Sequence, residues 1–135
     1  MIGVKEFDHG GDLVYPVEPA LEQYDELWRR IRHEHGHDQD GGRKLGTWLL
    51  GVGFCHLTMA ACYVSVAEPQ ALRGTAETFV GLLAESWGET LRHRGWATAE
   101  AIHEMSDAWR KWAQTPGAFF AGAWCEAVAR KEGAP

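Results

Sequence analysis

The sequence predicts an α/β fold, because two hydrophobic periodicities alternate along its 135 residues. Segments rich in apolar, β-branched or aromatic residues are typical of strands, and three occur: 1–8, 54–66 and 119–129. Apolar residues that recur every three or four positions are typical of amphipathic helices, and four such segments occur: 20–35, 42–52, 70–94 and 98–112. We therefore expect three strands and four helices around one core.

The first half of the chain begins with a strand that ends at the turn signal Gly10-Gly11. Pro16 and Pro19 bracket an extended link. Pro19 suits the first turn of a helix, because an N–H group at that position would have no hydrogen-bond partner within the helix. A shorter helix over 42–52 stops at Gly53. The segment 54–66 contains no Asp, Glu, Lys or Arg and is rich in Thr, Tyr, Val and Cys, which favours a strand.

The second half is mainly helical. Gly95 ends the helix over 70–94, and Thr98 is placed to cap the next one. Pro116-Gly117 closes that helix, and the alternation of large and small residues over 119–129 indicates a last strand. The sequence thus predicts a single domain, 1–135, in which 1–69 and 115–131 form a sheet with flanking helices and 70–114 is a helical insert.

Charge and composition exclude several classes of protein. The net charge is −6 and the 13 basic residues are scattered, so the basic surface of a nucleic-acid-binding protein is missing. No apolar run approaches the roughly 20 residues that span a bilayer, and no signal peptide is recognisable, so we expect no membrane association and a cytoplasmic location. The three cysteines have no CxxC spacing and are expected to be free thiols.

The order of these elements, together with several short motifs, resembles one enzyme family. The motifs are Gly3 to Gly11, Val52-Gly53-Phe54, Thr75 to Phe79, Trp96-Ala97-Thr98 and Phe119 to Lys131. In this order they resemble the C-terminal part of class I S-adenosylmethionine-dependent methyltransferases of the ubiquinone/menaquinone-biosynthesis type. The resemblance implies a truncated Rossmann-like fold, in which a three-stranded mixed sheet has the strand order first, third, second. It also implies that the insert 70–114 is a lid over the methyl acceptor.

The cofactor-binding half of that family has no counterpart in the chain. The family holds S-adenosylmethionine with a glycine-rich loop after the first strand and an acidic residue at the end of the second. The pairs Gly10-Gly11 and Gly41-Gly42 do not have the GxGxxG pattern between a strand and a helix and are expected to be turns. We therefore expect that the chain alone binds no cofactor and transfers no methyl group.

Two groups of residues are candidates for contact with a substrate. Ligands of open α/β sheets bind beyond the carboxyl ends of strands, and four candidates follow the first strand: Phe7, Asp8, His9 and Tyr15. The resemblance adds three aromatic residues of the insert, which would wall a pocket for a planar, apolar molecule: Trp87, Trp109 and Trp112. The alternative for these aromatic residues is that they pack in the hydrophobic core. The alternative for Asp8 and His9 is that they are ordinary polar residues of a loop.

Two other functions remain open. The cluster His33, His35, His37 and Asp38 contains zinc-ligand residue types, so a small metal-dependent hydrolase is one alternative, and a solvated helix end is the simpler interpretation. A non-catalytic binding or scaffold protein with an aromatic pocket is the other. For partners, we expect a homodimer or a complementary methyltransferase half, because the strand at 2–8 would have an open edge.

Overall fold

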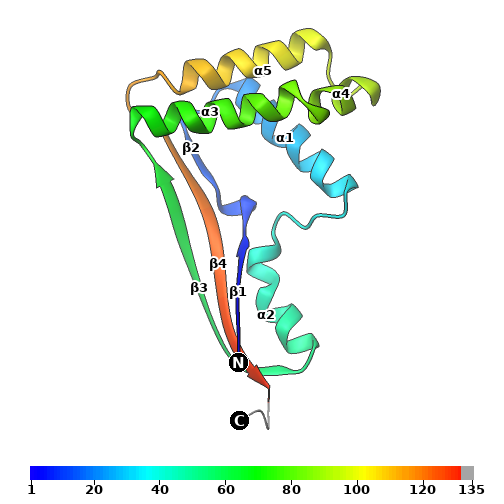
Figure 1. The fold of residues 1–135 in the computed structure, drawn as a ribbon, viewed down its shortest axis with the longest axis vertical. Coiled ribbons are helices and arrows are strands. Elements are labelled where there is room, and N and C mark those ends of the chain that lie inside the picture. Colours follow the sequence, from blue (N-terminus) through cyan, green and yellow to red (C-terminus); the bar gives the residue numbers. More distant parts are fainter. Residues whose placement is uncertain (132–135) are drawn as a thin grey trace. The chain divides into compact units, whose positions relative to one another are not determined.

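The computed structural model describes residues 1–131, which fold into a four-stranded sheet and five α-helices (Figure 1). The strands are β1 (Ile2–Phe7), β2 (Leu13–Tyr15), β3 (Phe54–Val66) and β4 (Phe119–Lys131). The helices are α1 (Pro19–Glu34), α2 (Gly41–Gly51), α3 (Pro69–Ala84), α4 (Ser86–His93) and α5 (Ala99–Trp112), and a short 3₁₀ turn covers His9–Gly11. The α/β class is confirmed. None of the helices in the described part is long and apolar enough to cross a membrane.

Strand β4 is the centre of the sheet. It pairs with β1 in antiparallel register from Ile2↔Ala129 to Phe7↔Trp124, and it also pairs with β2 and β3. The last strand therefore pairs with both of the other expected strands.

The expectation of three strands in a mixed sheet is wrong for the described residues. The sheet has four strands and its pairs are antiparallel. The extra strand is β2, which lies just before the extended link expected between Pro16 and Pro19. Its three residues stop directly before Pro16, and so short a segment shows no alternation that separates a strand from a link.

The helix expected over 70–94 is two helices. The chain breaks at Glu85 (φ −94°, ψ −140°), between α3 and α4. At Gly88 the backbone approaches the end of α3 so closely that a Cβ atom would lie 2.0 Å from the Leu83 carbonyl oxygen. Only glycine permits this approach. The cap expected at Thr98 is confirmed, since its Oγ1 accepts the Ala101 N–H at 3.1 Å.

The described residues form two compact units. Unit 1 comprises Met1–Leu13, Asp38–Ser65 and the segment from Ala121. In it, α2 packs on the face of the sheet that carries Ala127 and Ala129, whose small side chains let Leu45 and Leu49 approach the strands.

Unit 2 comprises Val14–His37 and Val66–Phe120. Here α1, α3, α4 and α5 surround a core of large side chains, among which Leu91, Met105 and Trp112 are almost fully buried. Each of the two units therefore has its own hydrophobic cluster.

Candidate functional site

Asp8, the first candidate after β1, is buried in unit 1 and bound to the start of α2. Its residue is 4% exposed. One carboxylate oxygen accepts the Arg43 backbone N–H at 2.7 Å, and Arg43 Nε lies 3.0 Å from both oxygens. Arg43 Nη2 completes the ion pair. Hydrogen bonds from this guanidinium hold the pKa of Asp8 below its usual range, and Asp8 raises the pKa of Arg43. The geometry gives Asp8 a structural role, because both oxygens are already occupied.

The other two candidates of unit 1, Phe7 and His9, lie beside Asp8. The Phe7 ring stacks on His9 with centroids 4.8 Å apart, and its centroid is 3.5 Å from that of Trp124. His9 Nδ1 and Asp12 Oδ2 are 2.9 Å apart, and the other Asp12 oxygen accepts the Ala123 N–H at 2.7 Å. The loop after β1 is therefore bound to β4 by its own polar side chains.

The glycine pairs do not form an open cradle for a cofactor. A Cβ atom on Gly10 would meet Asp40 Oδ1 at 2.5 Å, and one on Gly11 would meet the Ala123 Cβ at 2.9 Å. A Cβ on Gly42 would meet the Asp8 Cβ at 2.9 Å. These glycines permit close packing of the chain on itself, so the described residues do not fit S-adenosylmethionine in the way that the family binds it.

The aromatic candidates gather in unit 2. Trp109 is 3% exposed, and its ring contacts Tyr24 (5.4 Å between centroids), Phe79 (4.6 Å) and Trp112 (5.3 Å). Trp87 is half-buried, with its ring 6.5 Å from that of Tyr24. The edge-to-face geometry of several pairs is the arrangement that aromatic quadrupoles favour. We call Tyr24, Phe79, Trp87, Trp109 and Trp112 the aromatic cluster.

Two hydrogen-bond donors of the aromatic cluster have no partner among the described residues. They are the Tyr24 hydroxyl and Trp109 Nε1, and both atoms are buried. Burial also raises the pKa of the Tyr24 phenol, so the hydroxyl keeps its proton. Leaving a buried donor unpaired typically costs about 1–3 kcal/mol, so two in one cluster call for an explanation. Tyr24 was not among the predicted site residues. The only indication of it in the sequence was a residue with a polar hydroxyl group on the apolar face of an amphipathic helix.

Trp112 differs from Trp109 in this respect. Its Nε1 donates to the Tyr15 carbonyl oxygen at 3.0 Å, while the Tyr15 side chain is 64% exposed. Trp112 and Tyr15 are thus brought together, but through the Tyr15 backbone. The contact anchors α5 to the segment before α1 within unit 2.

The histidine cluster does not converge on one point. His33, His35 and His37 belong to unit 2, where His35 Nδ1 is 2.8 Å from the Ile31 carbonyl oxygen. Asp38 belongs to unit 1 and pairs with Lys44 Nζ at 2.7 Å, which lowers the Asp38 pKa. Over residues 1–131, no three His, Cys, Asp or Glu side chains come together as a metal site.

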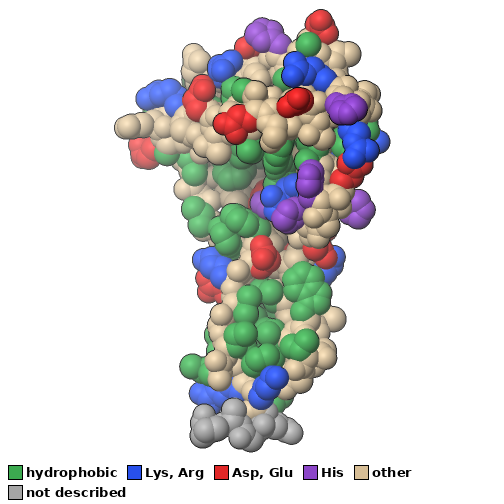
Figure 2. All heavy atoms as spheres, turned by 45° about the vertical axis from the view of Figure 1, so that its right-hand side comes forward, with side chains coloured by type: hydrophobic (Ala, Val, Ile, Leu, Met, Phe, Trp, Pro, Cys, Tyr) green, Lys and Arg blue, Asp and Glu red, His purple; other side chains and the backbone are tan. Residues whose placement is uncertain are grey.

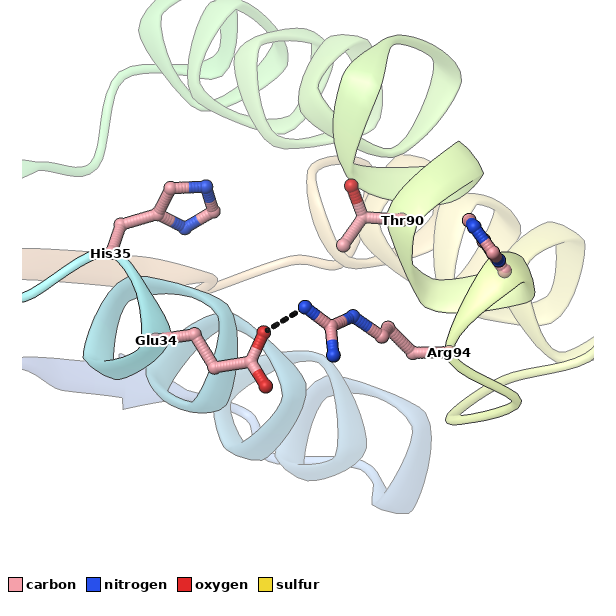
Figure 3. A pocket seen from close by; sticks show the side chains of 5 residues that line it. Glu34, His35, Thr90 and Arg94 are labelled. Carbon is pink, nitrogen blue, oxygen red and sulfur yellow. Dashed lines mark ion pairs between the residues drawn. The ribbon is translucent and has the colours of Figure 1, made fainter.

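A pocket of about 480 Å³ opens in unit 2 beside the end of α1 (Figure 3). It is lined by Glu34, His35, Thr90, His93 and Arg94. Figure 2 shows histidine side chains close to Lys and Arg side chains on the surface of the molecule. Only His35 was a candidate from the sequence. His93 and Arg94 were missed because two basic residues at a helix end are typical of a solvated terminus.

The sequence matches no model of a known protein family and no curated protein.

Proposed function

We propose that the chain is the acceptor-binding part of a class I S-adenosylmethionine-dependent methyltransferase. The observation that supports the family relationship is that antiparallel β4, the last strand, pairs with both β1 and β3. The resemblance of the sequence motifs implies that arrangement, in which the last strand pairs with both of the other expected strands. Here β3 and β4 are separated by three helices.

The aromatic cluster is the proposed binding site for the methyl acceptor. Its rings pack directly on one another in the free chain, so a planar, apolar molecule would bind by separating them, and the two unpaired donors, Tyr24 Oη–H and Trp109 Nε1–H, suit an oxygen atom on that molecule. An acceptor that carries a phenol or ketone oxygen satisfies a donor that the chain itself leaves unpaired. The rings would position the acceptor, and alignment with the methyl donor is the main requirement of this transfer.

The donor site is proposed to lie on a segment outside these 135 residues, because the space beside the glycine pairs Gly10-Gly11 and Gly41-Gly42 is filled by the chain's own atoms. S-adenosylmethionine supplies the methyl group in the resembled family. We accordingly propose that the chain alone is inactive in methyl transfer and works with a complementary half or as an assembly of two copies.

Two measurements on the whole chain test this proposal. Calorimetry with S-adenosylmethionine should detect no one-to-one site at micromolar concentration, whereas a planar apolar ligand with one oxygen, such as 1-naphthol, should bind saturably by the same method. Micromolar binding of S-adenosylmethionine would contradict the assignment of the donor site. Absence of saturable binding across a panel of such ligands would contradict the acceptor site.

Matched aromatic variants distinguish a binding site from a plain core. Tyr24→Phe and Trp109→Phe remove the unpaired donors, so each should weaken 1-naphthol binding about tenfold; Tyr24→Phe should also leave stability unchanged or slightly raised. Trp112→Phe is the control for the donors: it changes a ring of the same cluster but keeps both unpaired donors, so it should weaken binding less than Tyr24→Phe does, and loss of the bond to the Tyr15 carbonyl should reduce stability by about 1 kcal/mol or more. Equal effects of Tyr24→Phe and Trp112→Phe on binding would contradict the role of the unpaired donors.

A further inference from the structure

The pocket beside the end of α1 has a chemistry that the aromatic cluster does not share. Its lining contains one guanidinium, two imidazoles, one hydroxyl and one carboxylate, from Arg94, His35, His93, Thr90 and Glu34. Its volume of about 480 Å³ lies in the range of about 300–1,000 Å³ that is typical of small-molecule sites. The lining comes from two segments of the same unit, the end of α1 and α4 with its C-cap.

Arg94 is held in place on two sides. Its Nη2 lies 3.3 Å from Glu34 Oε2, and its Cζ lies 5.9 Å from the centre of the Trp96 ring. Figure 3 shows the guanidinium reaching from the end of α4 toward Glu34 of α1, with His35 and Thr90 around the same space. A guanidinium has five N–H donors in a planar fork, so the contact with Glu34 orients Arg94 and leaves donors for a second anion.

The neighbouring groups add positive charge. Arg30 Cζ lies 3.8 Å from the centre of the same Trp96 ring, so Trp96 contacts two guanidinium groups. His35 Nδ1 lies 2.8 Å from the Ile31 carbonyl oxygen, which can only accept, so Nδ1 carries a hydrogen; Nε2 then donates to an anion only when the ring is doubly protonated, because it is an acceptor in the neutral ring. The lining thus has one guanidinium and one carboxylate, from Arg94 and Glu34, and two imidazoles; Arg30 lies outside the lining, on the same Trp96 ring as Arg94.

From this arrangement we infer that the pocket binds a small molecule through an oxyanion group, either a phosphate or a carboxylate. A planar fork matches both groups, and bidentate, charge-assisted bonds to them are among the stronger polar contacts in proteins. His35 and His93 would contact further oxygens, and Thr90 would close the third side. The inference is independent of the proposed function, because no residue of the aromatic cluster takes part.

Titration of the whole chain with inorganic phosphate and with citrate, at constant ionic strength, tests the inference. The readout is the ring resonances of the histidines in proton–carbon NMR spectra. Resonances of His35 and His93 should shift saturably, while His103 on α5, whose side chain is 77% exposed, should not follow the same curve. Tighter binding of phosphate assigns a phosphate ligand, and tighter binding of citrate assigns a carboxylate. Shifts that never saturate, or that are equal at His103, overturn the site.

Variants of Arg94 give a second, independent test. Arg94→Gln should weaken the binding of the preferred anion at least tenfold, and Arg94→Lys, which keeps the charge but loses the fork, should have an intermediate affinity. Arg73→Gln removes the same charge from an exposed position on α3 of the same unit and should change affinity less than twofold. Because Arg94 is an exposed C-cap, the fold should survive, as circular dichroism would verify. Equal affinities of Arg94→Gln and Arg73→Gln overturn the inference.

Discussion

Asp8 is the residue in unit 1 whose contacts yield the clearest stability prediction. Its carboxylate binds both the backbone N–H and the guanidinium of Arg43, so Asp8→Asn loses the charge from a buried, hydrogen-bonded pair. Hydrogen bonds to charged groups contribute about 1.5–3 kcal/mol, and the 54% exposure of the Arg43 side chain argues for the lower end of that range. We expect a loss of about 1–2 kcal/mol in the free energy of unfolding, measured by urea denaturation at pH 7.

The effect of Asp8→Asn should depend on pH in a defined direction. Since Arg43 lowers the pKa of folded Asp8, the ion pair stabilises the fold fully above the ordinary carboxyl pKa of about 3.9. This stabilisation is lost as the pH falls from that value through the lowered pKa of the folded state. The difference between wild type and Asp8→Asn should therefore shrink toward pH 2. Asp25→Asn, which breaks an exposed pair with Arg29, should change stability by less than about 1 kcal/mol at pH 7.

At the same residue scale, the partner of Asp8 could not be predicted from the sequence. Arg43 lies 35 positions away in the chain, and no local pattern connects the two. The unpaired Tyr24 hydroxyl was missed for a similar reason. A tyrosine on the apolar face of a helix shows that the ring is buried, whereas only the tertiary structure shows whether the hydroxyl finds a partner.

Among the elements, α2 depends most on close approach to the sheet. A Cβ on Gly42 would lie 3.0 Å from the Phe7 carbonyl oxygen and 3.1 Å from the Cys125 Cβ. Gly42→Ala should therefore push α2 away from β1 and β4 and cost about 1–3 kcal/mol, as in other overpacked cores. Urea denaturation of the purified variant would measure this loss.

Gly51, at the other end of α2, is the matched control. A Cβ there would meet nothing within 4 Å, so Gly51→Ala should be neutral or stabilise the helix by up to about 1 kcal/mol. Destabilisation by Gly51→Ala as large as that by Gly42→Ala would show that helix propensity, rather than contact with the sheet, controls the first substitution.

Element boundaries were predicted well where a long segment has one clear period. The uncharged run at 54–66 coincides with β3, and Pro19 marks the start of α1. The break between α3 and α4 was missed because Leu83, Trp87 and Leu91 keep a spacing of four through it. Periodicity reports which residues face the core, and both helices face the same core, so the backbone can turn at Glu85 without disturbing the pattern.

For the whole molecule, the edge of β1 is the feature that bears on assembly. Among the described strands, β1 pairs only with β4. Asp8, directly after β1, donates its N–H to the Ala123 carbonyl oxygen at 3.0 Å. Antiparallel ladder bonds alternate along a strand. The backbone N–H and C=O groups of the even-numbered residues of β1 therefore point toward β4. Gly3, Lys5 and Phe7 direct their backbone groups outward, where the Glu6 carboxylate accepts the Phe7 N–H at 2.9 Å.

One register lets two copies pair along this edge. With a twofold axis at Val4, Gly3 of one copy lies opposite Lys5 of the other, and the Phe7 N–H, which Glu6 already binds, stays outside the ladder. An axis at Lys5 would set two lysines opposite each other, which is unfavourable. Helix α2 packs beside β1, and it exposes Trp48 and Leu50, as does its C-cap Val52, each at least 45% accessible, so apolar contacts can add to the strand pairing.

We therefore predict a homodimer of about 30 kDa, twice the 15.0 kDa chain, in light scattering coupled to size-exclusion chromatography at micromolar concentration. A Cβ on Gly3 would meet nothing within 4 Å, so this position accepts a side chain. Gly3→Pro removes an outward N–H that β4 does not use and should give a 15 kDa monomer with unchanged circular dichroism. Gly3→Ala keeps the N–H and should remain dimeric. A stable wild-type monomer, or a Gly3→Pro variant that is as dimeric as Gly3→Ala, would show that the β1 edge does not pair two copies.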